Sequence, residues 1–230
     1  MCEDSIADLG VLYPCSSVPV VVKKTRKYKA AVQLTPYQQE AVHGLMLGDV
    51  HADRAKEPYN TRLCFDYAVL PYITHLHELF SNFVTASIYS PVRLPDKRTG
   101  KIYVSYMFKT LALPALNIFR ELYYVPSFGK AIRVIPSNLG DYFTAVSLAY
   151  WIMDDGMYAG GGMRLCTDSF TLLEVQLLCK MLYTKFGIEC APQLRNGVCW
   201  RIYIPKAEMD KVRSLVKPYL LPCMLYKVGL

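Results

Sequence analysis

The sequence lacks any apolar run of the roughly 18 residues that a membrane-spanning helix needs. This holds although 53% of its 230 residues are hydrophobic, because Pro, Ser, Asp or Lys interrupts every candidate run. We therefore expect the apolar residues to form a core, with no membrane contact. None of the 8 cysteines forms a Cys-x-x-Cys pair, and no secretion signal precedes them. Zinc knuckles and a disulfide framework are not expected, and the thiols are predicted to be reduced and packed.

Acidic residues are in the minority, with 19 Asp and Glu against 26 Lys and Arg and a net charge of +7. This balance suits a polyanionic partner such as nucleic acid without requiring one. Acids at Glu3 and Asp4 argue against a transit peptide. Residues 1–34 show no clear period and end in a basic cluster at Lys23, Lys24, Arg26, Lys27 and Lys29, so we interpret them as an N-terminal extension.

Two helices that end in an aspartate are predicted. The first begins at Thr35-Pro36, with Thr as N-cap and Pro in the first turn, and runs to Gly48 before Asp49. The second covers Tyr142 to Asp155, and Gly156 ends it.

The chain also contains an internal duplication. Arg62-Leu63-Cys64-Phe65-Asp66 is matched by Arg164-Leu165-Cys166-Thr167-Asp168. Lys101-Ile102-Tyr103-Val104 is matched by Arg201-Ile202-Tyr203-Ile204, and both alternate as half-buried strands do. The matched blocks, with the two aspartates, lie at offsets of 106, 102 and 100 residues. Further helices are predicted at Tyr72–Thr85, Leu111–Tyr124, Thr171–Phe186 and Ala207–Tyr219, so each half reads helix, two strands, helix, two strands, helix.

The segments Val42 to Asp49 and Leu148 to Gly156 resemble the two copies of the LAGLIDADG motif. The chain from Thr35 to Leu230 is similar to single-chain members of the LAGLIDADG homing endonuclease family. The resemblance implies an α+β fold of two pseudo-symmetric αββαββα repeats, residues 35–136 and 137–230, forming a saddle-shaped β surface on DNA. It also implies a monomer that binds double-stranded DNA and cuts both strands of a long, asymmetric target.

In that family the motif helices pack on a pseudo-two-fold axis, and each delivers one aspartate to the scissile phosphates. The resemblance assigns this role to Asp49 and Asp155, and metal binding to these two together with Gly48 and Asp154. A carboxylate at a helix C-terminus adds a hard oxygen ligand to a negative dipole end, which attracts divalent cations. Two or three Mg²⁺ ions are expected, which Mn²⁺ or Ca²⁺ can replace in crystals.

Two basic residues complete the implied catalytic set. Lys227, in the segment Met224-Leu225-Tyr226-Lys227, matches a lysine near the active site of single-chain members. Arg133 lies three residues before Pro136, where the first half of such proteins carries its basic residue. Arginine can stabilise charge there, but its use as a proton relay is in doubt.

Helix packing is predicted from Gly44 and Gly48, which lie four residues apart on one helix face. Bulky Tyr150 and acidic Asp154 stand at the equivalent places of the second helix, where they could fit against the glycines opposite.

The DNA-binding face is expected to carry polar side chains from the predicted strands and their loops, aimed at base edges and phosphates. They are Arg54, Lys56, Arg62, Arg93, Lys101, Tyr103, Arg164, Gln193, Arg195 and Arg201.

Two other functions remain open. Some family members are intron maturases that assist RNA splicing, and a DNA-binding regulator could keep the saddle without chemistry. Paired Asp49 and Asp155 favour the nuclease, because RNA or DNA binding alone does not need two metal ligands. His43 and His51 are expected to be packed or structural, and His75 and His77 are not expected to share a metal. The resemblance to the family suggests that the protein is encoded in an organelle genome, of a mitochondrion or chloroplast.

Overall fold

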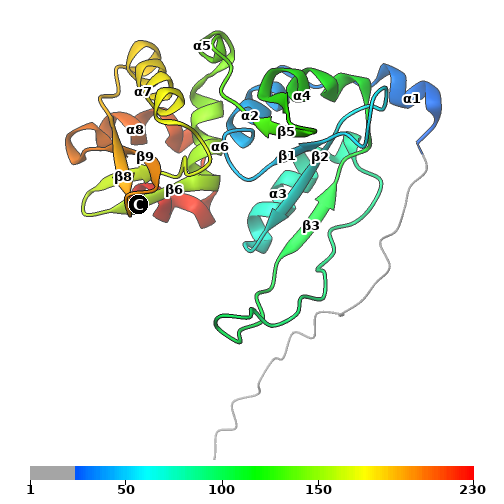
Figure 1. Cartoon of the computed structure of the whole chain (residues 1–230), viewed down its shortest axis with the longest axis horizontal. Helices are drawn as coiled ribbons and strands as arrows, with labels where there is room; N and C mark the ends of the chain where they lie inside the picture. The colour runs from blue at the N-terminus through cyan, green and yellow to red at the C-terminus, as the bar shows by residue number, and fades with distance from the viewer. Residues whose placement is uncertain (1–23) are drawn as a thin grey trace, which may run out of the picture.

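The protein is described by a computed structural model that places residues 24–230 (Figure 1). It has two halves, each built around one motif helix. In the first half, α2 (Pro36–Leu45) is followed by β1 (His51–Asp53), β2 (Arg62–Tyr67), α3 (Leu70–Leu79), β3 (Tyr106–Lys109) and α4 (Asn117–Tyr123). These strands form an antiparallel sheet in the order β1-β2-β3.

The second half repeats this plan with one more strand. Its elements are α6 (Ala145–Asp155), β6 (Gly156–Ala159), β7 (Gly162–Leu165), α7 (Leu172–Phe186), β8 (Ala191–Arg195), β9 (Cys199–Ile204) and α8 (Met209–Val216). The antiparallel sheet has the order β6-β7-β9-β8. The expected α+β fold with two related halves is thus confirmed.

Short elements join and flank the halves. They are α1 (Arg26–Ala31), β4 (Tyr124–Ser127), β5 (Lys130–Arg133), α5 (Leu139–Tyr142) and 3-10 turns at Ser81–Phe83, Pro114–Leu116, Lys206–Glu208, Lys217–Tyr219 and Pro222–Val228. Lys23 of the basic cluster lies outside the described residues, and the remainder of the cluster lies on and just before α1. Lys24 donates to the carbonyls of Ser81 and Asn82, which anchors this segment to the first half.

Threonine caps begin the three principal helices. The hydroxyls of Thr35, Thr144 and Thr171 each accept the backbone N–H three residues on, and Gln38, Ser147 and Glu174 reciprocate. The predicted start of the second helix at Tyr142 is wrong. The helix α6 begins at Ala145, after the Thr144 cap, and Tyr142 belongs to the separate α5. The first predicted helix is also shorter than expected, since α2 ends at Leu45 and turns carry the chain to Asp49.

The strand predicted at Lys101–Val104 is wrong. The third strand of the first sheet is β3, which pairs with β2 as β9 pairs with β7. Residues 101–104 lie instead in a hairpin arm, residues 88–105, that extends away from the body (Figure 1). Ile102, Tyr103 and Val104 are 63%, 54% and 58% exposed. The alternating residues therefore have no core to pack against, and their pattern does not produce a strand.

The two motif helices α2 and α6 pack side by side between the sheets (Figure 1). A methyl group placed on Gly44 would collide with the backbone carbonyl of Ser147, and one placed on Gly48 would collide with the side chain of Asp154. The predicted close approach at both glycines is therefore confirmed, and Asp154 fits against the glycine opposite. Tyr150 instead contacts Tyr37 and His75.

Each sheet has one buried and one outward face. In β2, Leu63, Phe65 and Tyr67 face the core, while Arg62 and Asp66 face outward. Among residues 24–230, no helix is long and apolar enough to cross a membrane.

Candidate active site at the motif helix ends

Asp155 is the last residue of α6, and Asp49 ends the turns that follow its partner helix α2. Desolvation, reinforced by the negative charge of Asp49, raises the pKa of Asp155 to about 7. Desolvation also raises the pKa of Asp49, against the lowering effect of Lys227 and Arg133. Asp49 raises the pKa of Asp155, and the same two cations, Lys227 and Arg133, act on both carboxylates.

Arg133 and Lys227 lie at the same two helix ends. Arg133 donates to the carbonyl oxygens of Gly48 and Val50, at 2.5 Å each. Lys227 Nζ donates to the carbonyl oxygen of Asp154 at 3.0 Å. Gly48 and Asp154 each directly precede a motif aspartate, so the basic residue of each half meets its own motif at the equivalent carbonyl. Both cations partly offset the negative charge of the site.

Asp154 has a different environment from its neighbour Asp155. Its Oδ1 accepts from Tyr72 at 2.5 Å, and its Oδ2 accepts from Tyr67 at 2.9 Å and from the backbone N–H of Asp49 at 3.1 Å. Burial raises the pKa of Asp154 well above its usual range. To bind a metal, this carboxylate would have to leave three donors, so only the backbone carbonyl of Asp154 suits its predicted metal role.

A hollow of 450 Å³ opens beside the second motif. Asp155 and Lys227 line it from one side, and Arg164, Cys166 and Arg201 line it from the sheet. The carboxylate of Asp155 thus lies next to the outward face of β7 and β9, where a phosphate backbone on the sheet could reach it.

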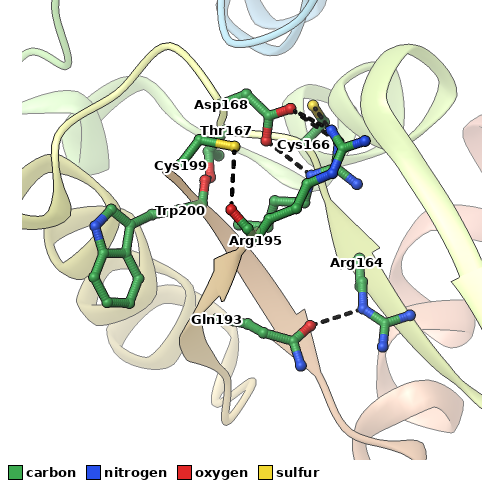
Figure 2. A network of polar contacts seen from close by, with 9 residues as sticks. Arg164, Cys166, Thr167, Asp168, Gln193, Arg195, Cys199 and Trp200 are labelled. Carbon is green, nitrogen blue, oxygen red and sulfur yellow. Dashed lines mark hydrogen bonds and ion pairs between the residues drawn. The ribbon is translucent and has the colours of Figure 1, made fainter. Parts of the chain in front are cut away.

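The outward face of the second sheet holds four predicted DNA-binding residues, of which Arg164, Gln193 and Arg195 are labelled in Figure 2. Arg164 Nε donates to Oε1 of Gln193 at 2.7 Å. Arg201 and Arg195 both pair with Asp168, at 2.8 Å each. Arg201 hydrogen bonding holds the pKa of Asp168 well below its usual range. These pairs fix the arginine head groups in a defined array before any partner binds.

The outward face of the first sheet is similar but less regular. Arg62 pairs with Asp53 and Arg93 pairs with Asp66, at 2.6 Å each. Lys109, which the sequence reasoning missed, is exposed on β3 beside Cys64. The alternating pattern at Lys101–Val104 predicts a strand there, so the sequence gives no reason to place Lys109 on a strand.

Four other predicted DNA-binding residues lie apart from the strands. Lys56 is exposed in the loop between β1 and β2, and Lys101 and Tyr103 lie in the arm. Arg54 follows β1, but its side chain is only 11% exposed, with its guanidinium paired to Glu57 and Glu121. Arg54 therefore stabilises the loop between β1 and β2. Its predicted contact with DNA would require its ion pairs with Glu57 and Glu121 to break.

The histidines have structural partners. His43 Nδ1 lies 2.9 Å from the Tyr123 hydroxyl, and His51 Nδ1 lies 3.0 Å from the Tyr124 hydroxyl. His75 and His77 contact different groups, the Tyr150 hydroxyl and the Ala86 carbonyl. Within the described part of the chain, no three His, Cys, Asp or Glu side chains are grouped to hold a metal. Any cation at Asp49 and Asp155 must take further ligands from backbone, water or substrate.

Comparison with known proteins identifies the family. The model of the LAGLIDADG DNA endonuclease family matches residues 39–212, which include most of α2 and all of α6. The chain belongs to this family. The homing endonuclease I-WcaI bound to its DNA recognition sequence has a similar structure, with a TM-score of 0.81 and 27% identity over 88% of this chain and 91% of that one.

Curated family relatives include both nucleases and maturases. The cytochrome b mRNA maturase bI2 of Saccharomyces cerevisiae is 34% identical over 197 residues, which are 82% of this chain and 46% of the maturase. The chain thus spans about half the length of that relative. The DNA endonuclease I-ChuI of Chlamydomonas applanata is 27% identical over 86% of this chain and 97% of its own length.

Proposed function

We propose that the chain is a site-specific, Mg²⁺-dependent DNA endonuclease that hydrolyses both strands of a long, asymmetric target. The main support is that Asp49 and Asp155 lie at the C-terminal ends of two packed helices, and that a basic residue binds the backbone carbonyl before each aspartate. A module that only binds nucleic acid has no need of two carboxylates whose charges oppose each other.

The donor set fits a hard divalent cation. Mg²⁺ prefers oxygen ligands and retains several waters, and the two aspartates supply carboxylate oxygens. The carbonyls of Gly48 and Asp154 could add ligands if Arg133 and Lys227 release them. We propose two or three Mg²⁺ ions, replaceable by Mn²⁺ or Ca²⁺, which supply an activated water and charge stabilisation when bound.

The chain's own residues prepare this site. The Asp49 and Asp155 carboxylates hold negative charge at the helix ends, where it favours cation binding. Arg133 and Lys227 are placed to stabilise negative charge that develops on the phosphate. As an arginine, Arg133 is suited to act through its charge and hydrogen bonds rather than as a proton relay.

The substrate surface is the outward face of both sheets. The relative I-WcaI is bound to its DNA recognition sequence, and the paired arginines here suit contacts with phosphates and guanines. One chain supplies two unequal halves, residues 35–136 and 137–230 after an extension of residues 1–34, so we propose a monomer on a non-palindromic site. Relatives named as intron-encoded or as cytochrome b mRNA maturases support an organelle genome as its origin.

Intron maturase activity, with intron RNA as partner, is the second candidate. Its support is the 34% identity to the yeast cytochrome b mRNA maturase. The two functions could coexist, because the basic outward faces suit either polyanion.

Cleavage and RNA binding distinguish the candidates. The protein is incubated with Mg²⁺ and a plasmid carrying the uninterrupted insertion site of its host intron, and its affinity for the intron RNA is measured in parallel. A double-strand break at one position is the expected result. No break at any Mg²⁺ or Mn²⁺ concentration, with tight binding to intron RNA, would replace the nuclease with the maturase.

A further inference from the structure

Asp154 is enclosed by groups from the other half of the molecule. It belongs to α6 in the second half, yet Tyr67, Tyr72 and the Asp49 backbone, all from the first half, donate to its carboxylate. Tyr67 and Tyr72 are 7% and 1% exposed, so these hydrogen bonds are largely shielded from water. Shielded hydrogen bonds to a carboxylate are stronger than exposed neutral ones.

Gly48 makes the contact possible. A Cβ at this position would occupy the space taken by the Asp154 side chain. The missing side chain at Gly48 in the first motif thus leaves the space that the Asp154 side chain of the second motif occupies. The contact is specific to one direction across the pseudo-dyad, because Gly48 has no side chain to return it.

Three contacts hold the backbone around Asp49, because Arg133 binds the carbonyls of Gly48 and Val50 on either side and the Asp49 N–H makes the third. Residues 46–49 form turns beyond the end of α2, and β1 begins only at His51. Among the hydrogen bonds of the described residues, the Asp49 N–H has Asp154 Oδ2 as its acceptor. Without the third contact the backbone at Asp49 would be less restrained, and a misplacement of about 1 Å can cost ~10²-fold in rate.

We propose that Asp154, held by Tyr67 and Tyr72, is a positioning residue that fixes the backbone of Asp49 for metal binding and cleavage. Its carboxylate does not contact the DNA or the cation. The catalytic consequence rests on the proposed function, whereas the positioning itself can be measured on the metal-free protein.

Three variants and one control test the proposal. Asp154→Ala removes the acceptor, and the double variant Tyr67→Phe/Tyr72→Phe releases the carboxylate while keeping the core volume. Tyr123→Phe is the matched control, since this buried phenol also loses a hydrogen bond, to His43, away from the motif ends. Tyr72→Phe alone provides a milder change should Asp154→Ala fail to fold.

The first readout is hydrogen exchange of the Asp49 amide without metal or DNA. Exchange is expected to be at least ~10-fold faster in Asp154→Ala and in the double tyrosine variant than in the native chain, and unchanged in Tyr123→Phe. An Asp49 amide that exchanges equally fast in the native chain and all variants overturns the proposal, whether or not the protein cuts DNA.

The second readout is the split between binding and turnover. Asp154→Ala is expected to lose ~10²-fold in single-turnover cleavage with nearly unchanged DNA affinity, because its carboxylate is occupied by Tyr67, Tyr72 and the Asp49 N–H. A native chain that does not cut defeats the proposed function but leaves the exchange result to decide the positioning. Full cleavage by both Asp154→Ala and the double tyrosine variant overturns the catalytic role of Asp154.

Discussion

Gly44→Ala should separate the two motif helices. The added Cβ would overlap the backbone carbonyl of Ser147, which cannot rotate away as a flexible side chain could. Relief requires movement of α2 against α6, at a typical overpacking cost of about 1–3 kcal/mol. Alanine also gains ~1 kcal/mol of helix propensity over glycine, which conceals part of that cost.

Gly140→Ala in α5 is the matched control, because a Cβ there would lie 3.8 Å from the Met181 side chain, an ordinary contact. Both variants replace a helical glycine by alanine, so the difference between their free energies of unfolding chiefly reports the overpacking at Gly44. Urea denaturation should show Gly44→Ala less stable than Gly140→Ala by about 1–3 kcal/mol. Cleavage should fall in Gly44→Ala alone, by ~10²-fold for a shift of about 1 Å. Equal stability and equal cleavage in the two variants would refute close packing at Gly44.

Two further predictions concern the buried histidine and the basic residue of the second motif. Burial lowers the pKa of His43 to about 4, below its ordinary 6.5, so the unfolded chain binds the proton more readily. The contribution of neutral His43 to the free energy of unfolding, about 3 kcal/mol, is therefore complete above pH 6.5 and lost as the pH falls toward 4. Urea titrations between these pH values should show that the free energy of unfolding of His43→Gln depends less on pH than that of the native chain. An unchanged pH dependence would contradict this prediction. Lys227→Met should lower single-turnover cleavage by at least ~10-fold with little change in DNA affinity, while equal losses of both would place Lys227 in binding instead.

The duplication and the motif helices were predictable because they are local patterns. Thr35-Pro36 is a typical helix start, and the glycines of the first motif indicate close helix packing. The two aspartates stand where the helices are predicted to end. The block Arg62–Asp66 lies within β2, whereas its match Arg164–Asp168 begins in β7 and continues past its end at Leu165. Such signals depend on neighbours in the chain, which the sequence displays directly.

Other parts depended on contacts between distant segments. The alternation at Lys101–Val104 looked like a strand, but no core lay beneath it, and β3 begins at Tyr106. The hairpin of β4 and β5, which carries Arg133 to Gly48, was not anticipated. Tyr67 and Tyr72 resemble ordinary core residues in sequence, and only folding reveals Asp154 between their hydroxyls.

The most direct test measures DNA cleavage and DNA affinity together for the native chain, Asp49→Asn and Asp155→Asn. With Mg²⁺ and the target site, the native chain should linearise the plasmid. Each variant should bind the same DNA with similar affinity and fail to produce the double-strand break, because each removes one carboxylate from the shared cation site. Complete double-strand cleavage by either variant would contradict the claim that the paired aspartates perform the reaction.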